Sequence, residues 1–134
     1  SPREHFADRL KTISPIVGHL RKYLHPGAKV LELGAGTGEL LHSIQPYVKE
    51  VTGIEIHKGF VEFMKDSLGI EAYAEDINKI DFGSRKFDLI ISIATLDHLI
   101  NPFETLTKLT GLLTDDGLIY VEVPNKEEAL NYYL

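Results

Sequence analysis

The sequence predicts an α/β fold with a doubly wound, mostly parallel sheet and helices on both of its faces. Strand-like and helix-like segments alternate at the spacing of right-handed βαβ units. Three glycines lie between the first expected strand and the helix after it, in Val30–Leu40. A nearly continuous apolar run, Phe87–Ile93, is typical of a strand that is buried on both faces of a parallel sheet.

Helical spacing of apolar residues predicts a lead-in helix over Ile16–Leu24, ended by His25-Pro26-Gly27, and an earlier turn or two within residues 5–13. The first strand is expected over Lys29–Leu33. The helix after the glycines should bury its leucines and isoleucine and stop at Pro46.

The middle of the chain repeats the alternation. A second strand is expected over Glu50–Ile56 and a helix over Lys58–Leu68, with Gly69 as its C-cap. The third and fourth strands follow over Ile70–Ala74 and Phe87–Ile93.

The next helix carries a full set of start signals. Asn101 is suited to the N-cap, Pro102 to the first helical position, and Glu104 completes a capping box. This helix is expected to bury Phe103, Leu106, Leu109 and Leu113. Asp115-Asp116-Gly117 should turn the chain into a fifth strand, Leu118–Val123, and Glu127–Tyr133 should form a last short helix.

Composition narrows the function classes. A chain of 134 residues with a formal charge of −6 fits one domain and gives no reason to expect nucleic acid, which is held by clustered Lys and Arg. It has no cysteine, so neither disulfides nor thiolate metal sites are possible, and a reducing cytoplasm is the expected location. Its apolar runs are shorter than a membrane span, so no membrane partner is expected.

The glycine-rich turn has the spacing G-x-G-x-G from Gly34 to Gly38. A dinucleotide fingerprint, G-x-G-x-x-G, would need a third glycine where this chain has Glu39, and a carboxylate there would repel a pyrophosphate. A ligand with a sugar, a base and an ammonium group fits better. The alternative is a purely structural turn that requires glycines.

The motif resembles the first motif of the class I S-adenosylmethionine-dependent methyltransferases. Further segments follow in the order of that family: Val51–Ile56, Ala72–Ile77, Phe87–Ser92 and Gly117–Asn125. The resemblance covers residues 28–125, and is strongest to the small-molecule, ubiquinone-biosynthesis-like members. It implies one Rossmann-like S-adenosylmethionine-binding domain over residues 1–134, with a helical lead-in at 1–27, a core at 28–125 and the strand order 3-2-1-4-5.

In this family the glycine loop takes the methionine part of S-adenosylmethionine, which places Gly34, Ala35, Gly36 and Gly38 at the cofactor. The resemblance gives Glu32 the role of organising that loop and reaching the methionine ammonium. A solvated acid at a strand end is the alternative for Glu32.

Glu55 follows Gly38 by 17 residues, at the carboxyl end of the second strand, where a carboxylate can accept both hydroxyls of a ribose. Ile56 beside it is included in the cofactor site. Asp76 resembles the family acid that binds the adenine amino group, with Ile77 covering the base. Asp76 could equally cap the turn at Asn78.

Ile93 and Ala94, after the fourth strand, would pack on the adenine or beside the methionine chain. His98 lies in a segment that resembles the acid-His-x-x-x-Pro segment of small-molecule methyltransferases, and could act as general base or as a structural histidine. Some relatives of the ubiquinone-biosynthesis type bind a divalent ion through an acid at the position of residue 94, together with the pair at 97 and 98. This chain has alanine at position 94, which cannot be a ligand, so no metal site is expected.

The predicted function is direct transfer of a methyl group from S-adenosylmethionine to a small-molecule acceptor. The alternatives are an inactive cofactor-binding domain or a fragment of a larger methyltransferase, and, less favoured, a nicotinamide-dependent oxidoreductase. The family adds two strands beyond the fifth, and the chain ends 11 residues after Val123. The edge of Leu118–Val123 should therefore be covered by a second copy in a homodimer, by residues 125–134, or by a missing C-terminal segment.

Overall fold

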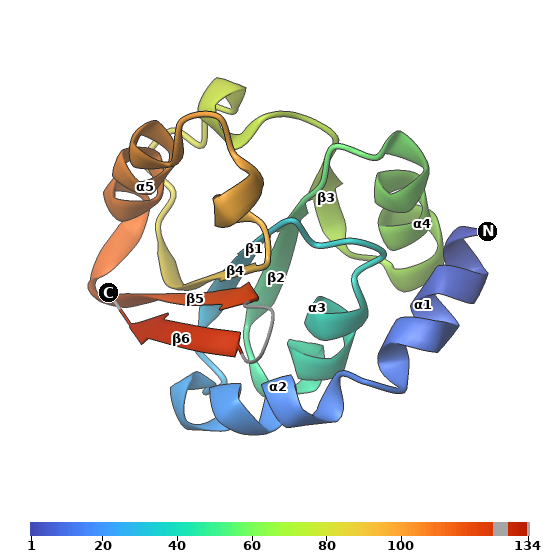
Figure 1. Ribbon diagram of the computed structural model, residues 1–134. Helices are drawn as coiled ribbons and strands as arrows, with labels where there is room; N and C mark the ends of the chain where they lie inside the picture. Colours follow the sequence, from blue (N-terminus) through green and yellow to red (C-terminus); the bar gives the residue numbers. More distant parts are fainter. Residues whose placement is uncertain (125–128, 134) are drawn as a thin grey trace.

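Six strands form one sheet in the order β3-β2-β1-β4-β5-β6 (Figure 1). The computed structural model describes the backbone of residues 1–124 and 129–133, and the side chains up to Glu122 except that of Asp97. The strands are β1 Lys29–Leu33, β2 Glu50–Ile54, β3 Glu71–Tyr73, β4 Phe87–Ile93, β5 Leu113–Pro124 and β6 Ala129–Tyr133. The first five pair in parallel, so the predicted order 3-2-1-4-5 is confirmed.

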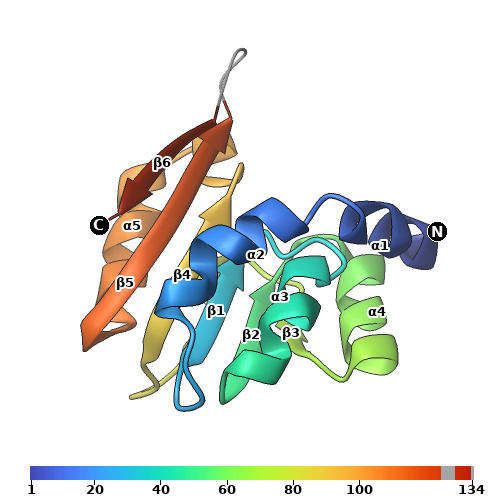
Figure 2. The same cartoon turned by 90° about the horizontal axis from the view of Figure 1, so that it is seen from below.

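Helices cover both faces of the sheet (Figure 2). On one face lie α2 Ser14–Leu20, α3 Glu39–Ile44 and α4 Lys58–Leu68, whose buried side chains share one apolar cluster. On the other face lie α5 Pro102–Gly111 and the short 3-10 helix η3 Ile77–Lys79. Three further 3-10 helices are η1 Arg21–Tyr23, η2 Gln45–Tyr47 and η4 Leu96–His98.

Successive residues of β1 serve the two cores in turn. Val30 packs in the cluster under α2, α3 and α4, and Leu31 packs in the cluster under α5. Both side chains are fully buried, and each stabilises the fold by about 1.5–3 kcal/mol. Glu32 follows in the same alternation, so it lies on the face of Val30.

The N-terminal helices differ from the predicted ones. A full helix, α1 Pro2–Leu10, replaces the expected turn or two, because the Ser1 hydroxyl caps the Glu4 amide and Pro2 occupies the first turn. The predicted helix over 16–24 is divided into α2 and η1. No residue of α1 is buried, and the helix packs on the outside of α3 and α4.

Strand β5 begins at Leu113, earlier than predicted. The segment Asp115-Asp116-Gly117, which was expected to be a turn before the strand, lies inside it where the register with β4 shifts. Phe87 and Leu89 of β4 face Leu113 and Leu118 of β5, so the extra residues of β5 bulge out. A Cβ on Gly117 would lie 3.1 Å from the Phe87 carbonyl oxygen, which explains the glycine. Leu113 therefore belongs to the strand and not to α5.

The last element is a strand where the sequence predicted a helix. Residues 129–133 form β6, which pairs antiparallel with β5 from Tyr120↔Tyr133 to Pro124↔Ala129. The remainder of the predicted helix, 127–128, lies outside the described residues. Of the three coverings expected for the β5 edge, the backbone of this chain's own residues 129–133 is the one observed.

Phe103 is also not where the helix pattern put it, because 82% of its side chain is exposed. The buried face of α5 instead includes Thr105 and Leu109, followed by Leu112 after the helix end. Thr105 Oγ1 accepts a hydrogen bond from Asn78 Nδ2 at 3.1 Å. Thr105, which is hydrogen-bonded to Asn78 of η3, thus takes the buried position that the apolar pattern had assigned to Phe103.

Arg85 joins the amino-terminal ends of β2 and β3. Its guanidinium donates to both Glu71 carboxylate oxygens, at 2.9 and 2.7 Å, and also to Glu50 Oε1 and Thr52 Oγ1, each at 3.1 Å. These hydrogen bonds from Arg85, more than any other cause, lower the pKa of Glu71 to about 2. Such a bidentate pair fixes the short edge strand β3 against β2.

Because the folded pKa of Glu71 is depressed, its contribution to stability is present above pH 4.5 and is lost as the pH falls towards about 2. The variant Glu71→Gln should lower the free energy of unfolding by up to ~1 kcal/mol at neutral pH, since the pair is partly solvated. Urea unfolding at neutral and acidic pH measures this, with Glu62→Gln on the exposed side of α4 as control. Equal acid sensitivity of the Glu71 variant and the unmodified protein would contradict the assignment.

Candidate functional site

The glycine loop, residues 34–38, connects the end of β1 to α3. Gly34, Gly36 and Gly38 have φ of +76°, +60° and +83°, a region that residues with a Cβ rarely adopt. A Cβ on Gly34 would collide with Thr95 Oγ1, and one on Gly38 would lie 2.7 Å from Met64 Cγ. The three glycines are therefore required both for the turn and for close packing.

All five backbone amides of the glycine loop donate to acceptors within the protein. The amides of Gly34 and Ala35 both donate to the Ile54 carbonyl oxygen, at 2.8 and 3.0 Å, and the Gly38 amide donates to the Ala35 oxygen at 3.0 Å. The Gly36 amide donates to Glu55 Oε1 at 3.0 Å, and the Thr37 amide to Glu39 Oε2 at 3.2 Å. A loop whose amides are satisfied in this way does not present the donor-rich concavity that binds phosphate.

Glu39 does not face a ligand as the sequence reading expected. Its residue is 7% exposed, and its Oε2 accepts from the Thr37 hydroxyl at 2.9 Å as well as from the Thr37 amide. Its Oε1 lies 3.6 Å from Arg9 Nε of α1. The Glu39 carboxylate was expected to repel a pyrophosphate at the helix start. It instead lies behind the loop, paired with Arg9 and Thr37, so its repulsion of a ligand in front of the loop is weaker than predicted.

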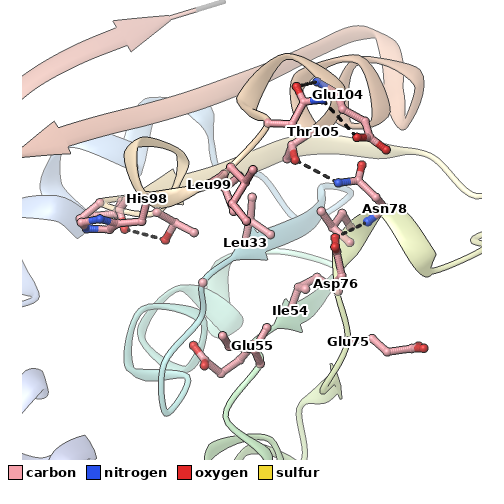
Figure 3. A pocket seen from close by; sticks show the side chains of 18 residues that line it. Leu33, Ile54, Glu55, Glu75, Asp76, Asn78, His98, Leu99, Glu104 and Thr105 are labelled. Carbon is pink, nitrogen blue, oxygen red and sulfur yellow. Dashed lines mark hydrogen bonds between the residues drawn. The ribbon is translucent and has the colours of Figure 1, made fainter.

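A cleft of about 770 Å³ opens beyond the carboxyl ends of β1, β2 and β4 (Figure 3). This is where open α/β sheets bind their ligands, at the point where strand order reverses. Four of the residues that line it are acidic, and none of those described there is Lys or Arg. The acids are Glu55, Glu75, Asp76 and Glu104. The cleft is therefore suited to a neutral or cationic ligand.

Glu55 lies at the carboxyl end of β2 and lines the cleft, as predicted. Strand β2 ends earlier than expected, at Ile54, and the Glu55 carboxylate accepts from the Gly36 amide and, at 2.9 Å, from the His57 amide. Each oxygen keeps a second lone pair for a further donor. Ile56 also lines the cleft and is 78% exposed.

Asp76 lies in the cleft and caps η3, so both readings of this residue have a basis. Its Oδ1 accepts from the Asn78 amide at 2.9 Å, which is the turn-capping alternative. Ile77 beside it is buried and also lines the cleft. Figure 3 shows the Asp76 and Asn78 side chains next to each other, with Glu75 pointing away from the other labelled side chains.

Ile93, Ala94 and His98 line the opposite side of the cleft. Ala94 is the described non-glycine residue with positive φ, at +55°, and its amide donates to the Glu122 oxygen at 2.7 Å. This strained turn directs the chain after β4 over the glycine loop, where Thr95 contacts Gly34. His98 is exposed, and its backbone amide donates to the Thr95 oxygen at 3.0 Å within the short helix η4.

Glu32 is buried on β1, between Gly53 of β2 and Ile91 of β4. Among the described residues, no hydrogen-bond partner exists for its Oε1. Burial raises the pKa of Glu32 well above its usual value, and the charges of Glu39 and Glu55 raise it further. The solvated alternative for Glu32 is therefore wrong.

The structure brings the predicted residues together in two groups. Gly34, Glu55, Ile56, Asp76, Ile77, Ile93, Ala94 and His98 line the cleft, whereas Glu32, Ala35, Gly36 and Gly38 lie behind it in and under the glycine loop. Sequence reasoning did not assign Thr95, Asn78 or Thr105 to the site, although all three are among the residues that line the cleft. A signal existed for Asn78, because Asp-x-Asn is a common turn pattern, but none pointed to Thr105.

A family model described as a methyltransferase domain matches residues 4–133, so the chain belongs to that family. The resemblance on which the sequence reading relied is thereby confirmed. The described residues contain no helix long and apolar enough to cross a membrane.

Individual relatives agree with this assignment. The chain is 34% identical over 118 residues to a malonyl-[acyl-carrier protein] O-methyltransferase of Anoxybacillus flavithermus, covering 82% of this chain and 45% of that protein. It is 28% identical to a ubiquinone biosynthesis O-methyltransferase of Glaesserella parasuis, covering 75% and 47%. The chain thus spans about half the length of these curated relatives.

Solved structures agree on the fold. A coclaurine N-methyltransferase, solved with N-methylheliamine and S-adenosylhomocysteine, matches with a TM-score of 0.72 at 26% identity, over 83% of this chain and 35% of that one. An S-adenosylmethionine-dependent methyltransferase from Aquifex aeolicus also reaches 0.72, at 24% identity, over 83% and 64%.

The raised pKa of Glu32 predicts a pH-dependent stability. A buried acid with a raised pKa contributes stability at low pH, and this contribution is lost as the pH rises above 4.5 through the folded-state pKa. We therefore expect Glu32→Gln to raise the melting temperature of the free protein at neutral pH and to flatten its decline with rising pH. Calorimetric scans at several pH values, beside Glu62→Gln, check this, and a lower melting temperature of Glu32→Gln at neutral pH would contradict it.

Proposed function

We propose that this chain binds S-adenosylmethionine in the cleft and takes part in transferring its methyl group to a small-molecule acceptor. The relatives named as a ubiquinone biosynthesis O-methyltransferase and, in Thalictrum flavum, as a pavine N-methyltransferase support this proposal. The observation that carries it is the state of the glycine loop, whose five amides all have acceptors within the protein. Such a loop suits a ligand that offers hydroxyls and a positive charge in place of a phosphate.

The residues of the cleft fit this ligand by their chemistry. Glu55 can accept ribose hydroxyls with its remaining lone pairs, and Asp76 can accept from the adenine amino group through the oxygen that does not cap η3. Ile77, Ile93 and Ala94 offer apolar surface for the base and the methionine chain. Glu32, buried and unpartnered at Oε1 behind the loop, is suited to an ammonium group.

S-adenosylmethionine supplies an activated methyl on a sulfonium, so the protein's task is to align the acceptor with it and to exclude water. His98, whose imidazole lies at the cleft, is our candidate for the general base where the acceptor is a weak acid. The cytoplasmic location expected from composition stays a prediction.

The first test compares two ligands. Calorimetric titration should show binding of S-adenosylhomocysteine, and no binding of NAD at matched concentration, because the dinucleotide would bring a pyrophosphate to amides that already have acceptors and to a cleft lined by acids. Binding of NAD without binding of S-adenosylhomocysteine would reject the proposal in favour of the oxidoreductase alternative.

The second test concerns Glu55. Replacement by alanine should weaken S-adenosylhomocysteine binding by roughly 1.5–3 kcal/mol, the range for hydrogen bonds to a charged group. The control, Glu62→Ala, removes an exposed carboxylate of α4 away from the cleft. Titration of both variants after circular dichroism has verified folding gives the measurement, and an unchanged affinity of folded Glu55→Ala would show that the ribose is held elsewhere.

A further inference from the structure

The glycine loop is held from behind by a side chain that no motif assigns. Glu39 uses its two carboxylate oxygens for different partners: Oε2 accepts from the amide and the hydroxyl of Thr37, and Oε1 pairs with Arg9 of α1. Thr37 is fully buried, so its contact with Glu39 is shielded from water. The carboxylate also lies against Gly36, where an added Cβ would be 3.3 Å from Oε1.

The two central amides of the loop are therefore held from opposite sides. Glu55, in the cleft, accepts from Gly36, and Glu39, behind the loop, accepts from Thr37. Any displacement of Glu39 would release the Thr37 amide and allow Gly36 to turn away from Glu55. The position of the residue that we expect to hold the ribose thus depends on a residue that does not touch the cleft.

Arg9 extends this dependence to the N-terminal helix. Glu39 is buried and its charge, like that of Glu55, acts on Glu32, so an unpaired carboxylate in that place would add to the repulsion at Glu32. Arg9 is the cation whose charge lowers the pKa of Glu32 against those effects. Helix α1 has no buried residue and also contacts α3 and α4 through Phe6, so Arg9 is the contact through which the position of α1 can act on Glu39.

We propose that Glu39 is a positioning residue that keeps the glycine loop in its ligand-binding conformation, and that Arg9 of α1 supports it, so that docking of α1 and ligand affinity are coupled. This rests on the proposed function in one respect, because the ligand whose affinity changes is the one assigned above. The conformational part concerns the loop alone and holds for the free protein.

The experiment uses the variants Glu39→Gln, Arg9→Met and the double variant, with Arg3→Met as matched control. Glutamine keeps an oxygen for Thr37 but loses the charge, and methionine keeps the apolar stem of arginine. Arg3 lies on the same helix but contacts Phe63 and Ser67 of α4 and not the loop. Two quantities are measured on the 134-residue chain: amide hydrogen exchange at Gly36 and Thr37 without ligand, and affinity for S-adenosylhomocysteine.

Arg9→Met and Glu39→Gln should each accelerate exchange at Thr37 and weaken S-adenosylhomocysteine binding by about two- to fivefold, the effect of a partly exposed ion pair. The double variant should lose little more ligand affinity than the single variant with the larger loss, because each single substitution already removes the Arg9–Glu39 pair. Arg9→Lys should recover part of the affinity, and added salt should narrow the difference between Arg9→Met and the unmodified protein. Arg3→Met should leave both quantities unchanged.

Three outcomes would overturn the proposal. One is unchanged Thr37 exchange in folded Glu39→Gln and Arg9→Met. The second is a lower melting temperature with unaltered ligand affinity, which indicates a structural role only. The third is an equal loss in Arg3→Met, which assigns the effect to helix docking as a whole. If the unmodified chain binds no S-adenosylhomocysteine, the proposed function fails, and Thr37 exchange in the free protein still decides whether Glu39 holds the loop.

Discussion

The arrangement of the site depends on the complete pairing of the glycine-loop amides. Two of these amides converge on one carbonyl oxygen, that of Ile54, so the loop is tied to the end of β2 as well as to β1. Two others are held by carboxylates, which places negative charge on both sides of the loop. The sheet order therefore determines more than topology, because β2 must lie beside β1 for the loop to have this shape.

The acids around the glycine loop differ in their hydrogen-bond partners. Glu55 and Glu39 each accept a hydrogen bond from a loop amide, so part of the accepting capacity of both carboxylates is used within the protein. Glu32 has no such donor among the described residues and stays buried with a raised pKa. Under our proposal, the ammonium group of a cationic ligand would supply the partner that this buried carboxyl group lacks at Oε1. The free protein is in this respect built for its ligand at the expense of stability.

Much of the fold could be predicted because it follows from local pattern. The strand–helix alternation predicted a doubly wound parallel sheet, and the three glycines located the edge where the cleft lies. The order of the five parallel strands was implied by the family resemblance and not by the alternation itself. What failed depended on tertiary partners. Residues 129–133 were read as a helix, yet the unpaired edge of β5 offers backbone partners that outweigh local propensity. Phe103 follows an apolar spacing, but the place in the core belongs to Thr105, whose hydroxyl accepts from Asn78, 27 residues away.

The residues of the candidate site likewise fall into those whose position could be predicted from the sequence and those whose position could not. The positions of Glu55 and Asp76 follow from strand ends, which pattern reveals, and both lie in the cleft. The direction of a side chain in the first turn of a short helix does not follow from pattern, and so Glu39 was read as a charge facing the ligand. Its partner Arg9 lies 30 residues earlier on a helix that the sequence barely indicated. Interactions between residues distant in sequence leave no periodic signal, because neither residue type nor spacing is constrained by the elements between them. In this protein they connect the surface helix α1 to the loop at the centre of the site, and this connection is where ligand affinity can be altered without touching the ligand.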